Sequence, residues 1–285
     1  MSRLRTDQTE TRWGPSRTVR RWWSLILPSA RLSVRQAERG RDPRSKAIKH
    51  ERIGLADLYL GDCRDVLPSI QADVMITDPV WPNCPAGALP GSDDPAALMC
   101  SAMAAMRSVK RAVVVMRHDS DPRFLVAMKM PFFRVQVLPY VIPSYLGRKL
   151  GGDEIAYCFG TPVPSAPGRR VIPGYAPKAQ PGGCKGNPHP CARNPGHFRW
   201  LVGWWSVEGE TVLDPFMGSG TTCAAAVAQG RKTVGIEIDP RYFDLACERV
   251  ADAQRQGTLD MVAKTEPGQS NRIQDQHDLL EIRSH

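Results

Sequence analysis

Residues 211–222 read Thr-Val-Leu-Asp-Pro-Phe-Met-Gly-Ser-Gly-Thr-Thr, and they carry the clearest information about the fold. A short apolar run leads to Asp214, a glycine loop follows, and an alanine-rich segment then continues to Gly230. Gly218 and Gly220 can adopt backbone conformations closed to other residues and, having no side chains, let a ligand approach the main chain. The pattern predicts a strand, a ligand-binding turn and a helix in direct succession.

An acid stands at the end of the next predicted strand. Glu237 lies in the sequence Gly-Ile-Glu-Ile-Asp (235–239), where a Rossmann-type unit places an acid to accept hydrogen bonds from ribose hydroxyls. A dinucleotide fingerprint requires a third glycine, G-x-G-x-x-G, and Cys223 stands at that position. S-Adenosylmethionine has no pyrophosphate but carries an ammonium group, which suits Asp214. The loop therefore favours S-adenosylmethionine over a nicotinamide dinucleotide as the ligand.

Segments with strand and helix character alternate between residues 53 and 255. This alternation predicts a Rossmann-like, three-layer α/β domain with a mostly parallel central sheet. The expected strands are 56–60, 73–77, 112–116, 133–140, 154–159, 211–216 and 232–238, and the expected helices are 94–109, 124–130, 196–206 and 242–254.

The tetrapeptide Asp78-Pro79-Val80-Trp81 follows a buried strand predicted at 73–77. Ligands bind outside the carboxyl ends of the strands in open α/β sheets, so Asp78 and the glycine loop face one crevice if their strands are neighbours. The exocyclic amine of adenine or cytosine is a poor nucleophile because its lone pair is delocalised into the ring. The Asp78 carboxylate and the Pro79 carbonyl offer two acceptors for the amine protons, and Trp81 offers a face for a base taken out of the stack.

The excess positive charge of the chain lies entirely in residues 1–52. This segment holds 14 Arg or Lys residues against 5 Asp or Glu residues, which equals the net charge of +9 for the whole chain. A basic segment of this kind can neutralise DNA phosphates, and an idle extension is the alternative. We therefore expect a disordered N-terminal arm at 1–52, a catalytic domain at 53–255 and a polar tail at 256–285.

Eight cysteines are present, but no CxxC motif occurs. Reduced thiols, no metal site and a cytoplasmic location are therefore expected. No apolar stretch approaches the length of a membrane-spanning helix. The loose cluster Cys184, His189, Cys191 and His197 matches no structural-zinc spacing.

Together these motifs resemble the DNA amino-methyltransferases, the adenine-N6 and cytosine-N4 enzymes, in their beta-type order with the catalytic motif first. Residues 78–81 match the family motif D-P-P-[YFW], and residues 214–222 match its cofactor loop almost residue for residue. The resemblance implies that Asp78, Pro79 and Trp81 are catalytic. It also implies that S-adenosylmethionine is bound by Asp62, Asp214, Phe216, Gly218, Gly220, Thr221 and Glu237.

The same resemblance implies double-stranded DNA as the substrate, and it is compatible with a cognate restriction nuclease and with a homodimer. Adenine is favoured because aspartate at the head of the tetrapeptide is commoner in the adenine enzymes. Val80 replaces the second proline of the motif, and Asn194 replaces a lysine of the family's H-P-x-x-K-P element, so a weakened or inactive relative is the alternative. The region expected to recognise DNA is 141–190, with Arg148, Lys149, Arg169, Arg170, Lys178 and Lys185 available for phosphates or base edges.

Overall fold

The computed structural model describes residues 49–139, 154–163, 176 and 193–265, with side chains up to residue 256. Most of the expected arm, the polar tail beyond Thr265 and most of the expected DNA-recognition region lie outside these ranges. So do Cys184, His189, Cys191 and the six basic residues expected to meet DNA. No helix among the described residues is long and apolar enough to cross a lipid bilayer.

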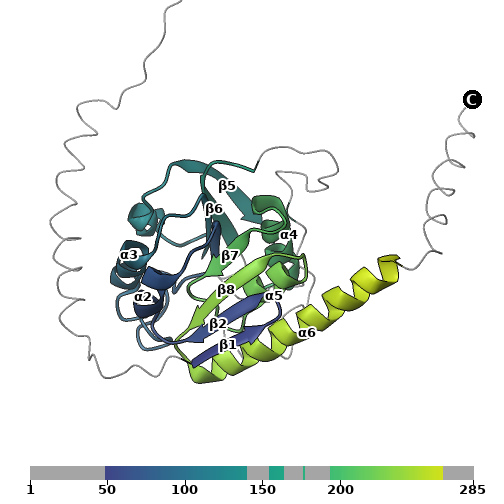
Figure 1. The fold of residues 1–285 in the computed structure, drawn as a ribbon. Helices are drawn as coiled ribbons and strands as arrows, with labels where there is room; N and C mark the ends of the chain where they lie inside the picture. Colours follow the sequence, from purple (N-terminus) through teal and green to yellow (C-terminus); the bar gives the residue numbers. More distant parts are fainter. Residues whose placement is uncertain (1–48, 140–153, 164–175, 177–192, 266–285) are drawn as a thin grey trace, which may run out of the picture. The chain divides into compact units, whose positions relative to one another are not determined.

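Eight strands of the described chain form one sheet in the order β1-β2-β8-β7-β3-β4-β6-β5 (Figure 1). The five strands from β2 to β4 in this order run parallel, while β1, β6 and β5 pair antiparallel toward the two edges. The strands are β1 (Lys49–Ile53), β2 (Ala56–Leu60), β3 (Val74–Thr77), β4 (Arg111–Arg117), β5 (Phe132–Leu138), β6 (Glu154–Gly160), β7 (Thr211–Asp214) and β8 (Lys232–Glu237).

Helices cover both faces of the sheet (Figure 1). Along β4, Val114 and Met116 pack into the core beneath α3, whereas Val113 and Val115 pack into the core beneath α4 and α5. This alternation is the period of two expected for a strand that is buried on both faces. The predicted three-layer fold is therefore confirmed. One face carries α2 (Cys63–Val66), η2 (Leu67–Ser69), α3 (Pro95–Ala105) and η3 (Pro122–Ala127), and the other carries α4 (Pro195–Trp205), α5 (Thr221–Val227) and α6 (Pro240–Thr265).

The centre of the sheet places the two predicted motifs side by side. Strand β7 lies between β3 and β8 and is parallel to both. Asp78 directly follows β3, Asp214 ends β7 and Glu237 ends β8. Because the strands are parallel neighbours, these three acids lie at the same edge of the sheet, as the sequence predicted.

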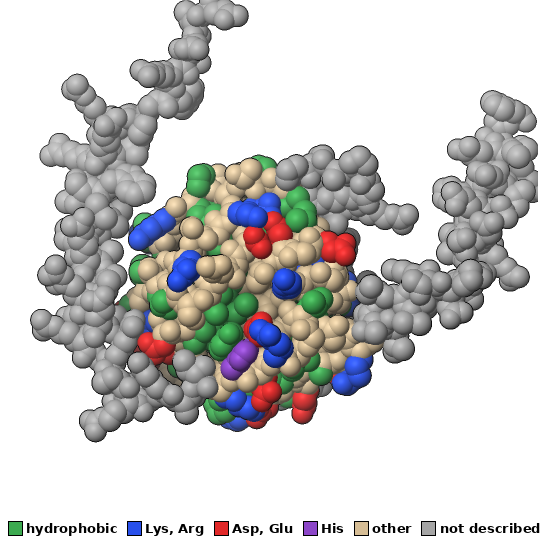
Figure 2. Space-filling model, in the orientation of Figure 1, with side chains coloured by type: hydrophobic (Ala, Val, Ile, Leu, Met, Phe, Trp, Pro, Cys, Tyr) green, Lys and Arg blue, Asp and Glu red, His purple; other side chains and the backbone are tan. Residues whose placement is uncertain are grey.

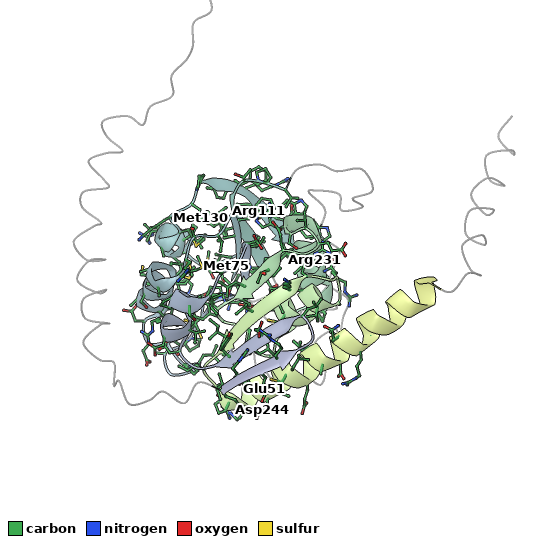
Figure 3. The ribbon with its side chains drawn as sticks, in the orientation of Figure 1. Glu51, Met75, Arg111, Met130, Arg231 and Asp244 are labelled. Atoms are coloured by element: carbon green, nitrogen blue, oxygen red, sulfur yellow. The ribbon has the colours of Figure 1, made fainter. Side chains whose placement is uncertain are left out.

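The first strand begins earlier, and the last helix ends later, than the boundaries expected for the catalytic domain. Strand β1 begins at Lys49, inside the range expected for the arm, because Gly54 adopts a left-handed conformation (φ 56°) that lets β1 and β2 form a hairpin. Lys49 also ties β1 to α6, with its ammonium 3.5 Å from Glu51 and 3.6 Å from Asp244. Figure 3 shows these two acids beside the first turns of α6. Helix α6 continues to Thr265, past the expected limit of 255, and no proline interrupts it after its first residue.

The helix expected at 124–130 is instead the short 3₁₀ helix η3. Asp121 caps it by accepting a hydrogen bond from the Arg123 amide, and Pro122 occupies its first position. The Met128 amide then bonds the Leu125 carbonyl three residues back, which is the 3₁₀ spacing. The apolar residues at 124–130 predicted an α-helix. The Asp121 cap before Pro122 and the hydrogen bond of the Met128 amide instead limit the helical segment to Pro122–Ala127.

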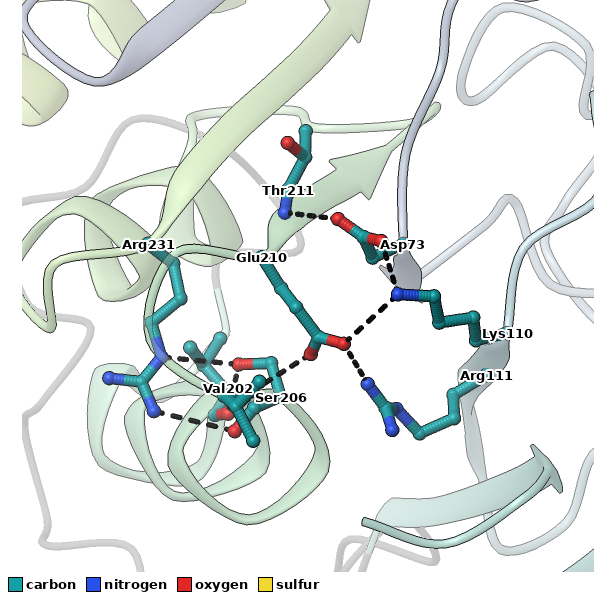
Figure 4. A network of polar contacts seen from close by, with 9 residues as sticks. Asp73, Lys110, Arg111, Val202, Ser206, Glu210, Thr211 and Arg231 are labelled. Atoms are coloured by element: carbon teal, nitrogen blue, oxygen red, sulfur yellow. Dashed lines mark hydrogen bonds and ion pairs between the residues drawn. The ribbon is translucent and has the colours of Figure 1, made fainter.

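An ionic network centred on the buried pair Arg111–Glu210 joins the amino ends of β3, β4 and β7, opposite the edge with the three acids (Figure 4). Glu210 is paired with Arg111 and lies 3.8 Å from the Lys110 ammonium. Lys110 also lies 2.8 Å from Asp73, which accepts a hydrogen bond of 3.0 Å from the Thr211 amide. The Arg111 side chain is only 7% exposed. We assign this network to stability, because it lies away from the motif residues.

Replacing Glu210 with Ala is expected to lower the free energy of unfolding by about 3–5 kcal/mol, because it leaves the buried Arg111 charge without its acid. Urea unfolding measures the change. The control is Glu208→Ala, since Glu208 is exposed two residues away and should change stability by no more than about 0.5 kcal/mol. Equal losses in the two variants would contradict this assignment.

On the face drawn in Figure 2, positively and negatively charged side chains of the described residues are interspersed. This distribution agrees with the charge count, in which residues 53–285 carry no net charge.

Candidate functional site

A cavity of about 270 Å³ opens at the carboxyl ends of β3, β7 and β8. Both predicted motifs line it, although residues 78 and 214 are far apart in the chain. The structure therefore brings into one cavity every predicted site residue except Gly220. Those lining it are Asp62, Asp78, Pro79, Trp81, Asp214, Phe216, Gly218, Thr221 and Glu237.

Gly220 has a structural role next to the cavity. It caps α5 in a left-handed conformation (φ 79°). A side chain at this position would place its Cβ only 2.9 Å from the Ala246 Cβ of α6. The absence of a side chain thus allows α5 to begin against α6, and Gly220 lies beside the cavity without lining it.

Glu237 connects the glycine loop to the end of β8. Its Oε2 accepts a hydrogen bond of 2.9 Å from the Gly218 amide, and its Oε1 accepts bonds of 2.9 and 2.8 Å from the Ile238 and Asp239 amides. Burial raises the pKa of Glu237, while the amide hydrogen bonds act in the opposite direction. A carboxylate has about four acceptor positions, so Glu237 can hold the loop and still accept a hydrogen bond from a ligand hydroxyl.

Asp214 is a buried acid that joins the ends of β7 and β3. It is 2% exposed, and its Oδ1 accepts hydrogen bonds of 2.7 Å from the Thr77 hydroxyl and 3.2 Å from the Phe216 amide. Burial raises the pKa of Asp214 to about 6, although hydrogen bonds from Thr222 and Thr77 lower it. A cationic group in the cavity would stabilise its ionised form.

Two other residues predicted to bind cofactor already have side-chain partners. The Asp62 carboxylate caps α2 and accepts a hydrogen bond of 2.8 Å from the Arg64 Nε. The Thr221 hydroxyl accepts one of 2.8 Å from the Arg249 Nη1. Both residues line the cavity, and both side chains also hold neighbouring elements in place.

Asp78 and Trp81 form a fixed pair at the end of β3. The Trp81 indole N–H donates to Asp78 Oδ1 at 2.8 Å and to the Val115 carbonyl at 3.1 Å. These bonds set the plane of the indole ring. The Asp78 side chain is 16% exposed, and burial raises its pKa to about 6.

Arg193 is a residue of the site that the sequence motifs did not indicate. Its Nε donates to Asp78 Oδ2, and its Nη1 donates to Glu154 Oε1 at 2.8 Å. The guanidinium carbon lies 4.0 Å from the centroid of the Trp81 ring. The sequence offers only a weak signal for this contact, because residue 193 is 115 positions from Asp78. Its neighbour Asn194 is the position at which the sequence departs from the H-P-x-x-K-P element.

Asn194 itself has a local role. It is 6% exposed, and its side chain caps α4 by accepting a hydrogen bond of 2.9 Å from the Gly196 amide. Asparagine is among the preferred residues at a helix N-cap. Asn194 thus caps a helix at the position where the family element has a lysine. A positively charged side chain lines the cavity at the preceding position, Arg193.

Comparison with known proteins identifies similar chains. Residues 168–248 match a family model described as DNA methylase. The orphan methyltransferase M.BamHII of Bacillus amyloliquefaciens is 54% identical over 46 residues, which are 16% of this chain and 17% of that protein. The DNA adenine methyltransferase YhdJ of Escherichia coli (strain K12) is 32% identical over 94 residues, which are 33% of this chain and 32% of that protein. The matched segments thus span about a third or less of these relatives.

A solved structure shares the fold over most of its length. The M1.HpyAVI-SAM complex superposes with a TM-score of 0.54, covering 68% of this chain and 98% of that one at 19% sequence identity.

Proposed function

We propose that this chain, which resembles the DNA methylases that act on adenine-N6 and cytosine-N4, methylates the exocyclic amine of a base turned out of double-stranded DNA. The observation that carries the proposal is the shared cavity, in which Asp78 and the glycine loop meet. A ligand on the loop and a base beside Asp78 would then be adjacent, as group transfer requires.

S-Adenosylmethionine fits the loop side of the cavity. When bound, it supplies an electrophilic methyl group on a sulfonium. Glu237 has acceptor capacity for the ribose hydroxyls, and the buried Asp214 suits the ammonium group. Phe216 and Gly218 lie between Asp214 and Glu237 in the sequence. Both residues also line the cavity. The described residues include no group of His, Cys, Asp and Glu suited to a metal ion.

The other side of the cavity fits the base. Trp81 provides a ring for stacking, and its plane is already set by hydrogen bonds to Asp78 and Val115. The Asp78 carboxylate would accept one proton of the amine in a hydrogen bond, and the Pro79 carbonyl would accept the other. Acceptors placed in advance stabilise the positive charge that develops on the nitrogen during transfer.

Adenine is the proposed base, supported by Asp78 at the head of the tetrapeptide and by the similarity to an adenine methyltransferase. The alternative is a relative that binds cofactor and DNA but has lost activity, motivated by Val80 and Asn194. We further propose that the basic residues before β1 and within 141–190 contact DNA phosphates.

Sequencing with modified-base detection on DNA from cells that express the protein tests the function. N6-methyladenine within one sequence context is the expected result, with mass spectrometry of digested DNA to identify the base. Methylcytosine alone would reverse the choice of base. No modified base from a folded, cofactor-binding protein would support the inactive relative.

The pH dependence should reveal two buried acids. Burial raises the pKa of both Asp78 and Asp214 to about 6, and both act as carboxylates in this proposal. Activity should therefore be constant above this pH and fall as the pH drops through it. Since both groups lose charge in the same range, the fall in rate should exceed tenfold per pH unit. Of these two acids only Asp214 is proposed to contact S-adenosylmethionine, so cofactor binding should fall less steeply than the rate, which titration calorimetry across the pH range can check. A rate that stays constant to well below pH 6 would contradict the assignment.

A further inference from the structure

The guanidinium of Arg193 makes the two contacts that the proposed target base would need. Its Nε–H donates to Asp78 Oδ2, as an exocyclic amine N–H would. Its planar group lies 4.0 Å from the centroid of the Trp81 ring, which is stacking distance for a base. A flat group with an N–H donor at its edge therefore already contacts both the proposed catalytic acid and the ring proposed for stacking.

We propose that Arg193 occupies the place of the target base in the DNA-free protein, and that a base entering the cavity displaces its guanidinium from Asp78 and Trp81. The inference rests on the proposed function, because it takes Asp78 and Trp81 as the base-binding pair. It assigns to Arg193 control over how readily a base enters, a role beyond the transfer chemistry itself.

Glu154 provides the partner that keeps Arg193 in place. Its carboxylate accepts a hydrogen bond of 2.8 Å from the Arg193 Nη1, and its side chain is only 5% exposed. Glu154 begins β6, where it pairs in register with Arg117 of β4 and Leu138 of β5, so the carboxylate is fixed by the sheet. When a base displaces the guanidinium from Asp78, the bond to Glu154 can persist and keep the arginine charge paired.

The exchange has an energetic consequence. A hydrogen bond in which both partners are charged is stronger than one from a neutral donor, and an entering base replaces the Arg193–Asp78 bond with a bond from a neutral amine. Base entry is therefore opposed in the native protein. Removing the guanidinium should favour the extruded base by about tenfold.

The test compares the full-length protein with Arg193→Met and with the double variant Arg193→Met/Glu154→Gln. Methionine keeps much of the length of arginine without a charge or donor. The double variant also removes the Glu154 charge, so that Glu154 is not left as a buried acid without its arginine partner. The control is Arg255→Met, because Arg255 lies on α6 with its side chain 70% exposed.

The probe is a duplex with 2-aminopurine at the target position, chosen from the modified-base sequencing of the wild-type protein. Fluorescence of 2-aminopurine rises when it leaves the stack, so the readout reports extrusion and not methyl transfer. At about pH 8, the extrusion equilibrium should increase about tenfold in both Arg193 variants. It should be unchanged in Arg255→Met.

Steady-state kinetics on the natural duplex give a second readout. Displacement predicts a lower KM for DNA in the Arg193 variants, whereas a purely structural role predicts a KM that is unchanged or raised. Equal or weaker extrusion in both Arg193 variants would overturn the inference while the wild-type protein still methylates DNA. Absence of any methylated base in the wild-type sequencing would instead refute the proposed function.

Discussion

Asp78→Ala should reduce the rate of methyl transfer by about a hundredfold or more, because it removes a preorganised acceptor for the amine that becomes cationic. Binding of S-adenosylmethionine should be retained. The described contacts of Asp78 are with Trp81 and Arg193, whereas the glycine loop is held by Glu237. The effect should therefore appear in kcat for DNA methylation and not in cofactor affinity.

Single-turnover methylation with labelled S-adenosylmethionine measures this rate. Asp78→Asn serves as a second variant, because it keeps the side-chain shape and one acceptor for the Trp81 indole and should still lose most of the activity. Asp244→Ala is the control, since this acid lies on α6 with its side chain 67% exposed. Wild-type rates in both Asp78 variants would show that the acid has no catalytic role.

Glu237→Ala should weaken S-adenosylmethionine binding by about ten- to a hundredfold, since a hydrogen bond to a charged group contributes roughly 1.5–3 kcal/mol. Two effects combine in this variant. The carboxylate would lose its bond to the ribose, and the Gly218 amide would lose the acceptor that holds the loop. Gly218→Val should also weaken binding, because Gly218 has a φ of 52° that a β-branched residue adopts only with strain.

Isothermal titration of the purified variants with S-adenosylmethionine measures both affinities, and thermal unfolding shows that each variant is folded. Glu208→Ala is the matched control, an exposed glutamate before β7 at the opposite edge of the sheet. If both Glu237→Ala and Gly218→Val bind the cofactor with wild-type affinity, the cofactor does not occupy this loop.

The central unit of the protein could be predicted from its sequence alone. The strand, glycine loop and helix at 211–227 depend on neighbouring residues, so their pattern is readable without knowledge of the fold. The same holds for Asp78, Asp214 and Glu237, each placed at a strand end by a short apolar run before it. From there, the rule that parallel strands bind ligands at their carboxyl ends was enough to predict one shared site.

Which side chains meet in that site depends on the packing of elements that are distant in the chain. Arg193 reaches Asp78 because α4 begins beside the end of β3, and Glu154 reaches Arg193 because β6 pairs antiparallel with β4. Gly220 resembled Gly218 in sequence, but the approach of α6 assigned it to packing against Ala246. These contacts depend on the order of strands in the sheet and on helix packing across it. Both are set by burial summed over distant residues, which a local pattern does not contain.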